Sequence, residues 1–437
     1  MHFFPITDAS MREPIQAAYA LGAGRPPAHR LSYLLCWPVA ARRTRVLAVG
    51  LIFLIGATVG LFYAHLAVQV WTGTKPLNDF FALWSWSAML HTTVHPVALY
   101  APAQVQAFLH AQDPAFKGNY PFAYPPSFLL VIWPLELLPR NFSYWLWVLT
   151  TLACYLAVVG QRPWRRIIVV LLVFAPATAL TVSAGQNGFL TAALMIGGCR
   201  LLDRRPLLAG VLFGLLSCKP QLGVLIPVAL LAARQWRAIA AAAVTVLASV
   251  VASAAAFGWT MWAQWMSALV GLFHLVGKQT QLYHEMPTIA ANLHALGIAP
   301  VAVQAAQVAA GIAAGAAVFV CWRRGGTSRL TSAALQAGTF LATPYAFVYD
   351  LPLVTNAVME LVLERLEAQE AFSITEVLVA AGSVLLPVAM AMSHGSIPWS
   401  GFVLPPLFVV IVRRALLRHR AVDAPGGRVD PVPQRAG

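Results

Sequence analysis

Apolar residues occur in long runs that short polar stretches interrupt, from about residue 46 to about residue 416. A helix needs about 20 consecutive apolar residues to cross the roughly 30 Å of hydrocarbon in a bilayer. Apolar and polar residues do not alternate along these runs, as they do in the strands of a membrane barrel. The pattern therefore predicts an all-α, polytopic membrane protein.

Thirteen runs are long enough to be candidate helices. They lie at about 46–70, 126–139, 141–160, 167–183, 188–202, 207–219, 221–233, 238–258, 298–321, 329–345, 350–363, 373–391 and 399–416. Basic clusters near both ends are expected on the cytoplasmic side, which requires an even number of crossings. The run from Pro125 to Pro139 is short and holds four prolines. We therefore expect a re-entrant helix there and about twelve transmembrane helices in all.

The composition fits a protein that lies in a bilayer. Of 437 residues, 59% are hydrophobic and 10% are charged, which is too little polar surface for a soluble globule of this size. The net charge of +14 comes from arginine clusters between the apolar runs, such as "ARRTR" at 41–45. Such clusters are typical of cytoplasmic loops rather than of a nucleic-acid surface. The five cysteines are isolated, so disulfides and cysteine metal sites are not expected.

The apolar runs divide the chain into three parts. Residues 1–45 are expected to be a cytoplasmic segment without a cleavable signal peptide, 46–420 an integral-membrane domain, and 421–437 a disordered cytoplasmic tail. The first run is then a signal anchor, which sends residues 71–125 to the outer side as a large loop. Most of the unusual polar residues fall in outer loops, so we expect the chemistry on that face.

Carboxylates are scarce in the first half of the chain. Between residues 13 and 285 the only acids are Asp79, Asp113, Glu136 and Asp203. Asp79 precedes "FFALWSWSAML", which predicts an amphipathic helix at the membrane surface. Its carboxylate is expected either to cap this helix or to act as a general base that takes a proton from a sugar hydroxyl. The two roles are compatible, because a cap also orients its carboxylate.

Other outer turns hold further candidate residues. Gln186 and Asn187 in "SAGQNG" either bind sugar hydroxyls or close the turn. Lys219 in "CKPQ" either extends its ammonium to the membrane interface or holds a phosphate group. His284 and Glu285 are a second pair of titratable groups, in the other long outer loop.

Tyr349 in "TPYAFVYD" belongs either to an aromatic belt at the interface or to the wall of a ligand site. His91 and His95 are four residues apart, but a zinc site needs at least three protein ligands, so neither a metal nor another cofactor is expected. The chain lacks the motifs of nucleotide-sugar enzymes, serine hydrolases, zinc proteases and ATP-binding proteins. A nucleotide donor is therefore not expected.

Five pieces of the chain, read in order, resemble the integral-membrane glycosyltransferases of family 87. This GT-C group includes mycobacterial polyprenol-phosphate-mannose-dependent mannosyltransferases and related arabinofuranosyltransferases. The pieces are "NDFFALWSWSAML", "YPFAYPPSFLLVIWPLELLP", the long stretch from "GQNGFLTAALM" through "CKPQLGVLIPVALLAARQWRA", "MPTIAANLHALG" and "TPYAFVYDLPL".

The resemblance implies a GT-C fold and transfer of a hexose, with mannose as the first expectation, from a polyprenyl-phosphate donor to a lipid or glycan acceptor. It implies inversion at the anomeric carbon on the outer face of a bacterial inner membrane, and it places the family's general base at Asp79. Lys219 or an outer-loop lysine is then expected to meet the charge of the leaving phosphate. Tyr124 in "FAYPP" joins the expected substrate-binding residues, which are Lys219, Gln186, Asn187, His284, Tyr349 and Tyr124.

Three other functions fit parts of the pattern: an arabinofuranosyltransferase of the same family, a flippase or transporter of lipid-linked sugar, and a non-catalytic scaffold. A transporter is expected to show internal repeats and polar residues deep within its spans. Here the polar residues gather at one face. The sequence therefore favours the transferase. Membrane lipid is an expected partner, and nucleic acid is not.

Overall fold

A computed structural model describes residues 39–73, 78–92, 95–116, 118, 120–160, 165–278, 283–393 and 397–423. The expected disordered tail, apart from its first three residues, and most of the expected N-terminal segment lie outside these ranges. The described residues form helices and no strands. Within them, the all-α prediction is confirmed.

The α-helices follow one another in the order in which the apolar runs occur. They are α3 (Val39–Trp71), α4 (Asn78–Thr92), α5 (Pro102–Gln112), α6 (Leu129–Ile132), α7 (Arg140–Val159), α8 (Arg165–Val173), α9 (Pro176–Ala184), α10 (Gly188–Leu201), α11 (Pro206–Leu215), α12 (Ile226–Ala232), α13 (Trp236–Phe257), α14 (Thr260–Lys278), α16 (Ile289–Ala295), α17 (Pro300–Gly325), α18 (Arg329–Ala342), α19 (Pro352–Ala368), α20 (Ile374–Met392) and α21 (Trp399–Asp423).

Short 3-10 helices join several of these elements. They are η3 (Pro96–Tyr100), η4 (Pro126–Phe128), η5 (Trp133–Leu137), η6 (Leu216–Cys218), η7 (Pro220–Leu222) and η8 (Val348–Asp350).

Six of the described helices are long and apolar enough to cross a membrane: α3, α7, α13, α17, α20 and α21. The pair α8 and α9 passes the same test only as one span, bent by 56° between the two helices. This finding supports an integral-membrane protein. It does not confirm the expected twelve spans, because α10 has only 14 residues and covers about 21 Å at 1.5 Å per residue.

The short helices form the centre of the bundle and the long ones surround it. Nearly every side chain of α10 and α18 is buried. The long helices, in contrast, expose large apolar side chains, such as Leu247 of α13 and Ile312 of α17, which are 63% and 68% exposed. Apolar side chains at such positions suit contact with lipid. A helix surrounded by other helices has no lipid contact of its own, so it does not need to match the bilayer thickness.

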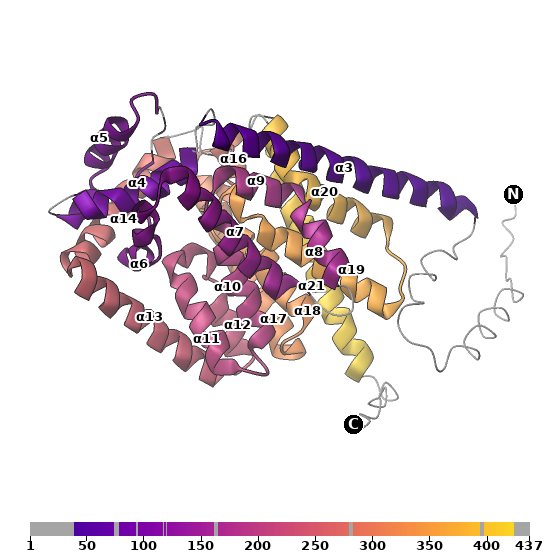
Figure 1. Ribbon diagram of the computed structural model, residues 1–437. Coiled ribbons are helices and arrows are strands. Elements are labelled where there is room, and N and C mark those ends of the chain that lie inside the picture. The colour runs from indigo at the N-terminus through magenta and orange to yellow at the C-terminus, as the bar shows by residue number, and fades with distance from the viewer. Residues whose placement is uncertain are drawn as a thin grey trace, which may run out of the picture.

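The elements of the expected first outer loop gather at one end of the molecule, where α4 contacts α5 and α6 and lies at the left in Figure 1. Helix α5 is amphipathic, with Val105 and Leu109 buried and most of its other residues exposed. Helix α4 is not: Phe80 to Met89 are buried on all sides apart from the half-buried Trp84. The prediction of an amphipathic surface helix after Asp79 is therefore wrong for α4, because the neighbouring helices, chiefly η5 and α5, pack around it.

The segment from Pro126 to Leu137 is a short apolar helix built from η4, α6 and η5. Its twelve residues cover about 18 Å, which is less than the roughly 30 Å of hydrocarbon. Ser87 and His91 of α4 bond to the carbonyl oxygen of Trp133, at 2.7 and 3.0 Å. The segment thus packs against α4 and holds it in place. Its length fits the expectation that it does not cross the membrane by itself.

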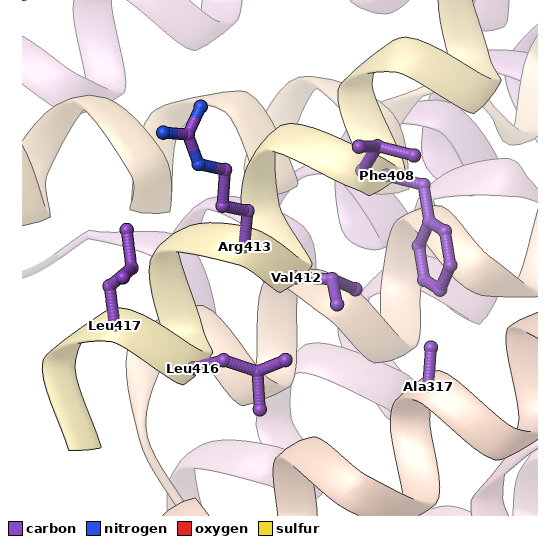
Figure 2. Close-up of a pocket in the computed structure, with 7 residues that line it drawn as sticks. Ala317, Phe408, Val412, Arg413, Leu416 and Leu417 are labelled. Carbon is purple, nitrogen blue, oxygen red and sulfur yellow. The ribbon is translucent and has the colours of Figure 1, made fainter. Parts of the chain in front are cut away.

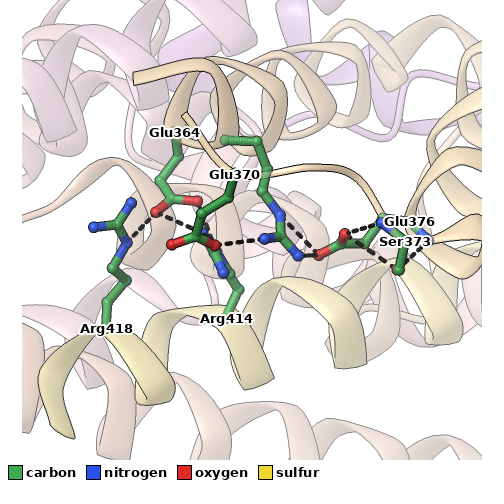
Figure 3. Close-up of polar contacts among 7 residues, drawn as sticks. Glu364, Glu370, Ser373, Glu376, Arg414 and Arg418 are labelled. Atoms are coloured by element: carbon green, nitrogen blue, oxygen red, sulfur yellow. Dashed lines mark hydrogen bonds and ion pairs between the residues drawn. The ribbon is translucent and has the colours of Figure 1, made fainter. Parts of the chain in front are cut away.

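Charged residues tie together the ends of α19, α20 and α21 (Figure 3). Arg414 of α21 bonds Glu364 of α19 at 2.9 Å and also pairs with Glu370. Arg365 of α19 joins Glu370, at 2.6 Å, to Glu376 in the first turn of α20. The result is a chain of alternating charges across three helices, which we call the charge ladder.

Two glycines in the turn between α9 and α10 allow very close packing. Gly185 has a φ of 66° and ends α9 in the left-handed region, where glycine has no steric penalty. At Gly188, an added Cβ would lie 1.7 Å from the carbonyl oxygen of Tyr349. The absence of a side chain at this position lets the start of α10 touch the backbone of η8.

We predict that Gly188→Ala destabilises the protein by about 1–3 kcal/mol, because the backbone of η8 has to move away from the new methyl group. The matched control is Gly315→Ala in α17, where the nearest atom would lie 3.7 Å away. Thermal unfolding in detergent, followed by circular dichroism, measures both. Equal melting temperatures for the two variants would contradict the close contact.

Candidate functional site

Asp79 lies in the first turn of α4 and is half-buried. It is inside the helix rather than at the preceding capping position, yet a carboxylate in a first turn still interacts favourably with the free backbone N–H groups there. Seven residues further on, the same face of the helix carries Trp86, whose ring packs edge-on against Phe122 and Tyr124. Asp79 therefore lies two helical turns from Trp86, on the face of α4 that packs against these aromatic rings.

Two titratable side chains from distant parts of the chain face Asp79. Burial raises the pKa of the Tyr120 hydroxyl, and the charge and hydrogen-bonding capacity of the nearby Asp79 carboxylate raise it further. Loss of hydration raises the pKa of Glu285, although part of its side chain is exposed, and the charge of Asp79 raises it further. Glu285 also interacts electrostatically with Tyr120. These three residues form an acidic group, which we call the Asp79 cluster.

The loop that holds Glu285 is fixed to the element that follows α18. The backbone N–H of Val348, in η8, donates to the carbonyl oxygen of Glu285 at 2.9 Å. The Thr288 hydroxyl donates to the carbonyl oxygen of Pro344 at 3.3 Å and also caps α16. The side chain of Glu285 thus faces Asp79 from a segment whose backbone is anchored.

Beneath the Asp79 cluster lies a buried ion pair. Pro220 interrupts the helical course between η6 and η7, and Lys219 lies at the break, 1% exposed. Its ammonium donates to both carboxylate oxygens of Asp350, at 2.7 and 2.9 Å, and to Oδ1 of Asn187 at 3.2 Å. The backbone N–H of Phe347 also donates to Asp350, at 3.1 Å. The ammonium is buried, so the reading in which Lys219 extends to the membrane interface is wrong.

Tyr349 joins the ion pair to the Asp79 cluster. Its ring lies 4.6 Å from the Lys219 ammonium, stacks on Phe347 with ring centroids 5.2 Å apart, and is 7% exposed. Burial raises the pKa of its hydroxyl, and Tyr124, Asp350 and Asp79 add to the effect. Tyr349 therefore lies within electrostatic reach of both charged groups.

Tyr124 completes the aromatic wall. Its ring stacks on Phe128 with centroids 4.2 Å apart, and its hydroxyl faces Asn187 and Tyr349. The Tyr100 hydroxyl donates to the carbonyl oxygen of Tyr124 at 2.8 Å, which holds this part of the chain in place.

Four buried polar atoms of the candidate residues and of Trp86 have no hydrogen-bond partner among the described residues. They are Oε1 of Gln186, Nδ2 of Asn187, Nε1 of Trp86 and Nδ1 of His284. Leaving a buried polar group unpaired is costly, so such atoms mark places where a ligand or water is expected to bind. A sugar supplies hydroxyl groups that can donate to and accept from all four.

The described part of the chain contains no group of three or more His, Cys, Asp or Glu residues that could hold a metal ion. His91 is occupied by the carbonyl oxygen of Trp133. The residues gathered here offer a carboxylate, side-chain amides and aromatic surfaces.

The structure brings most of the expected residues into one region. Tyr124, Asn187, Lys219 and Tyr349 are linked by the contacts described above, and Asp79 is linked to them through Tyr349. Gln186 lies next to Asn187 in the turn, and His284 lies next to Glu285. No described contact joins either of them directly to Asp79.

Tyr120 did not stand out in the sequence, and the pairing of Asp350 with Lys219 was not predicted. Tyr120 is one of many aromatic residues in its loop, and nothing local distinguishes it. Asp350 did carry a signal, because an acid and a lysine in otherwise apolar surroundings are expected to pair when both are buried.

We predict that Lys219→Met destabilises the protein by about 3–5 kcal/mol, because Asp350 remains as an uncompensated buried charge. The double variant Lys219→Met/Asp350→Leu is expected to recover much of this loss. The control is Arg140→Met, which removes a half-exposed pair with Asp113 at 4.0 Å and is expected to cost less than about 1 kcal/mol. Melting temperatures in detergent distinguish these outcomes. If Lys219→Met is as mild as Arg140→Met, the buried pair does not stabilise the site.

Comparisons with known proteins identify the family. The model of glycosyltransferase family 87 matches residues 122–344, just over half of the chain. No curated protein matches the chain, and no solved structure does. The matched range includes Tyr124, the "SAGQNG" turn and Lys219, but it begins after Asp79 and ends before Tyr349. By this match the chain belongs to glycosyltransferase family 87 and is a membrane glycosyltransferase.

Proposed function

We propose that the protein transfers a hexose, with mannose as the first candidate, from a polyprenyl-phosphate donor to a lipid or glycan acceptor. We place the reaction at the outer face of the bacterial inner membrane, with inversion at the anomeric carbon. The observation that carries the proposal is the Asp79 cluster, which lies beside the aromatic wall and the unpaired amides.

Asp79 is the proposed general base. The Tyr120 hydroxyl lies close enough to orient its carboxylate, and the side chain is half-buried, so its contact with water is reduced. A carboxylate in this setting can take the proton of an acceptor hydroxyl as that oxygen attacks the anomeric carbon. The bond from this carbon to the phosphate oxygen then breaks on the opposite face, and the anomeric configuration inverts.

The leaving polyprenyl phosphate carries negative charge and needs a cationic or hydrogen-bonding partner. Asp350 already neutralises Lys219, so we assign Lys219 to positioning Asn187 and Tyr349 rather than to direct contact with the phosphate. Lys75 and Lys117 of the first outer loop lie outside the described residues. These two and Lys278, in the other long outer loop, are the remaining lysines, and we propose that one of them binds the phosphate.

We propose that Gln186, Asn187 and His284 recognise sugar hydroxyls through their unpaired atoms. Tyr124 and Tyr349 supply aromatic faces and hydroxyl groups next to them. An arabinofuranosyl donor would occupy the same region. An assay with each of the two donors therefore shows which sugar the protein transfers.

We predict that Asp79→Asn lowers the rate of transfer by about 10²–10⁴-fold, because the amide cannot accept the proton. The assay uses purified protein in lipid vesicles with polyprenyl-phosphate-mannose, and polyprenyl-phosphate-arabinose in parallel. Release of polyprenyl phosphate is measured together with formation of the glycosylated acceptor.

The matched control is Asp113→Asn. Asp113 is the other acid of the first outer loop and pairs with Arg140 at its surface. This variant is expected to keep full activity. A folded Asp79→Asn variant with wild-type transfer would refute the assignment of the base.

We predict that Glu285→Gln shifts the acid limb of the pH profile of kcat/KM to lower pH, by about one unit or less. The negative charges of Asp79 and Glu285 repel each other, so the proton uptake of the two groups is coupled. Removing the Glu285 charge makes Asp79 easier to keep ionised, and activity then persists to lower pH. Glu285→Asp keeps the charge and should resemble the wild type. A shift to higher pH would contradict the proposed coupling.

A further inference from the structure

A groove of about 420 Å³ lies between α17 and α21, far from the Asp79 cluster (Figure 2). Its lining is apolar except for one arginine and consists of Ala317, Phe408, Val409, Val412, Arg413, Leu416 and Leu417. Val409 and Leu417 are 61% and 46% exposed. Both helices are long and apolar enough to cross a membrane, so this side of the bundle meets lipid chains.

The arginines of α21 divide into two groups. Arg414 and Arg418 face α19 and are neutralised by Glu364, and Arg414 also by Glu370 (Figure 3). Arg413 is exposed, and none of the described residues forms an ion pair with it. The carboxylates of the charge ladder are already shared among other arginines. Within the described part of the chain, Arg413 is therefore a positive charge without an ionic partner, beside an apolar groove.

The last turn of α17, the other helix of the groove, also carries positive charge. Arg323 and Arg324 lie in the last turn of α17, are exposed, and have no ion-pair partner among the residues that the structure describes. This end of the bundle is the one that the arginine clusters predict to be cytoplasmic. An anion that approaches the groove meets the charge of Arg413, because Glu364 and Glu370, the carboxylates paired with α21, bind Arg414 and Arg418.

The groove is too far from the proposed reaction site to serve the donor phosphate there. Helix α19 begins two residues after Asp350 and carries Glu364, the partner of Arg414. Fourteen residues separate Asp350 from Glu364, which corresponds to roughly 20 Å along a helix. A ligand at Arg413 therefore occupies a separate site.

We propose that this groove binds an anionic phospholipid, with one acyl chain along Phe408, Val412 and Leu416 and the phosphate group at Arg413. The proposal follows from the complementarity of the surface: the lining is apolar except for the guanidinium of Arg413, which has no ion-pair partner among the described residues, and both helices are long and apolar enough to cross a membrane. A guanidinium can bond two phosphate oxygens at once. This site is independent of the glycosyl transfer proposed above.

The experiment uses the full-length protein, purified in detergent, stripped of bound lipid and then mixed with defined lipids. Native mass spectrometry measures how much phosphatidylglycerol or phosphatidylcholine of identical acyl chains remains bound. The wild type is expected to retain phosphatidylglycerol preferentially. Arg413→Gln is expected to weaken phosphatidylglycerol binding about fivefold, and Arg413→Lys to restore most of it.

Two further variants separate the charge from the groove. Ala317→Phe fills the groove but keeps Arg413, and it is expected to weaken binding of both lipids. Arg204→Gln removes an exposed arginine of the α10–α11 turn, outside the groove, and is expected to change neither.

Three results would overturn the proposal. The first is equal retention of the two lipids by the wild type. The second is an equal effect of Arg413→Gln and Arg204→Gln. The third is displacement of bound phosphatidylglycerol by inorganic phosphate with no effect of Ala317→Phe, which would mean that Arg413 binds a free anion and the groove holds no acyl chain.

Discussion

The buried pair of Lys219 and Asp350 is the interaction on which the site depends. Two charges removed from water are tolerated only when they meet each other and when other hydrogen bonds satisfy their remaining atoms. Asp350 accepts from Lys219 and from the backbone of Phe347, and Lys219 donates to Asn187. One ion pair thereby fixes the "SAGQNG" turn, the η6–η7 break and η8, which come from three distant parts of the chain.

The positions of the helices could be predicted from the sequence, because runs of apolar residues are a local signal. The runs expected at 238–258 and 373–391 correspond to α13 and α20 within two residues. The depth of each helix could not be predicted in the same way. Whether an apolar helix contacts lipid or protein depends on its neighbours. The side chains of α10 and α18 are apolar because they pack against other helices of the protein.

The candidate site was predictable residue by residue but not as an arrangement. Asp79, Asn187 and Lys219 stood out as polar groups in apolar surroundings, and the turn glycines marked a tight connection. The partner of Lys219 is 131 residues away along the chain, and no local pattern encodes such a distance. The packing of η5 and α5 against α4 is likewise a tertiary feature, so the burial of the aromatic side chains of α4 could not be predicted from its own sequence.

The short central helices have a consequence for how the protein is made. Helix α19 carries Glu360, Glu364 and Glu367, and Glu360 is buried against Arg200 of α10 at 2.6 Å. A helix with three glutamates does not partition into lipid by itself. Helix α10 is too short to span the hydrocarbon core of a bilayer. Both are therefore expected to leave the translocon only together with partners that cover them. We therefore expect groups of helices to insert into the membrane cooperatively. Ion pairs such as Arg200–Glu360 favour the insertion of α10 and α19 together with the helices around them.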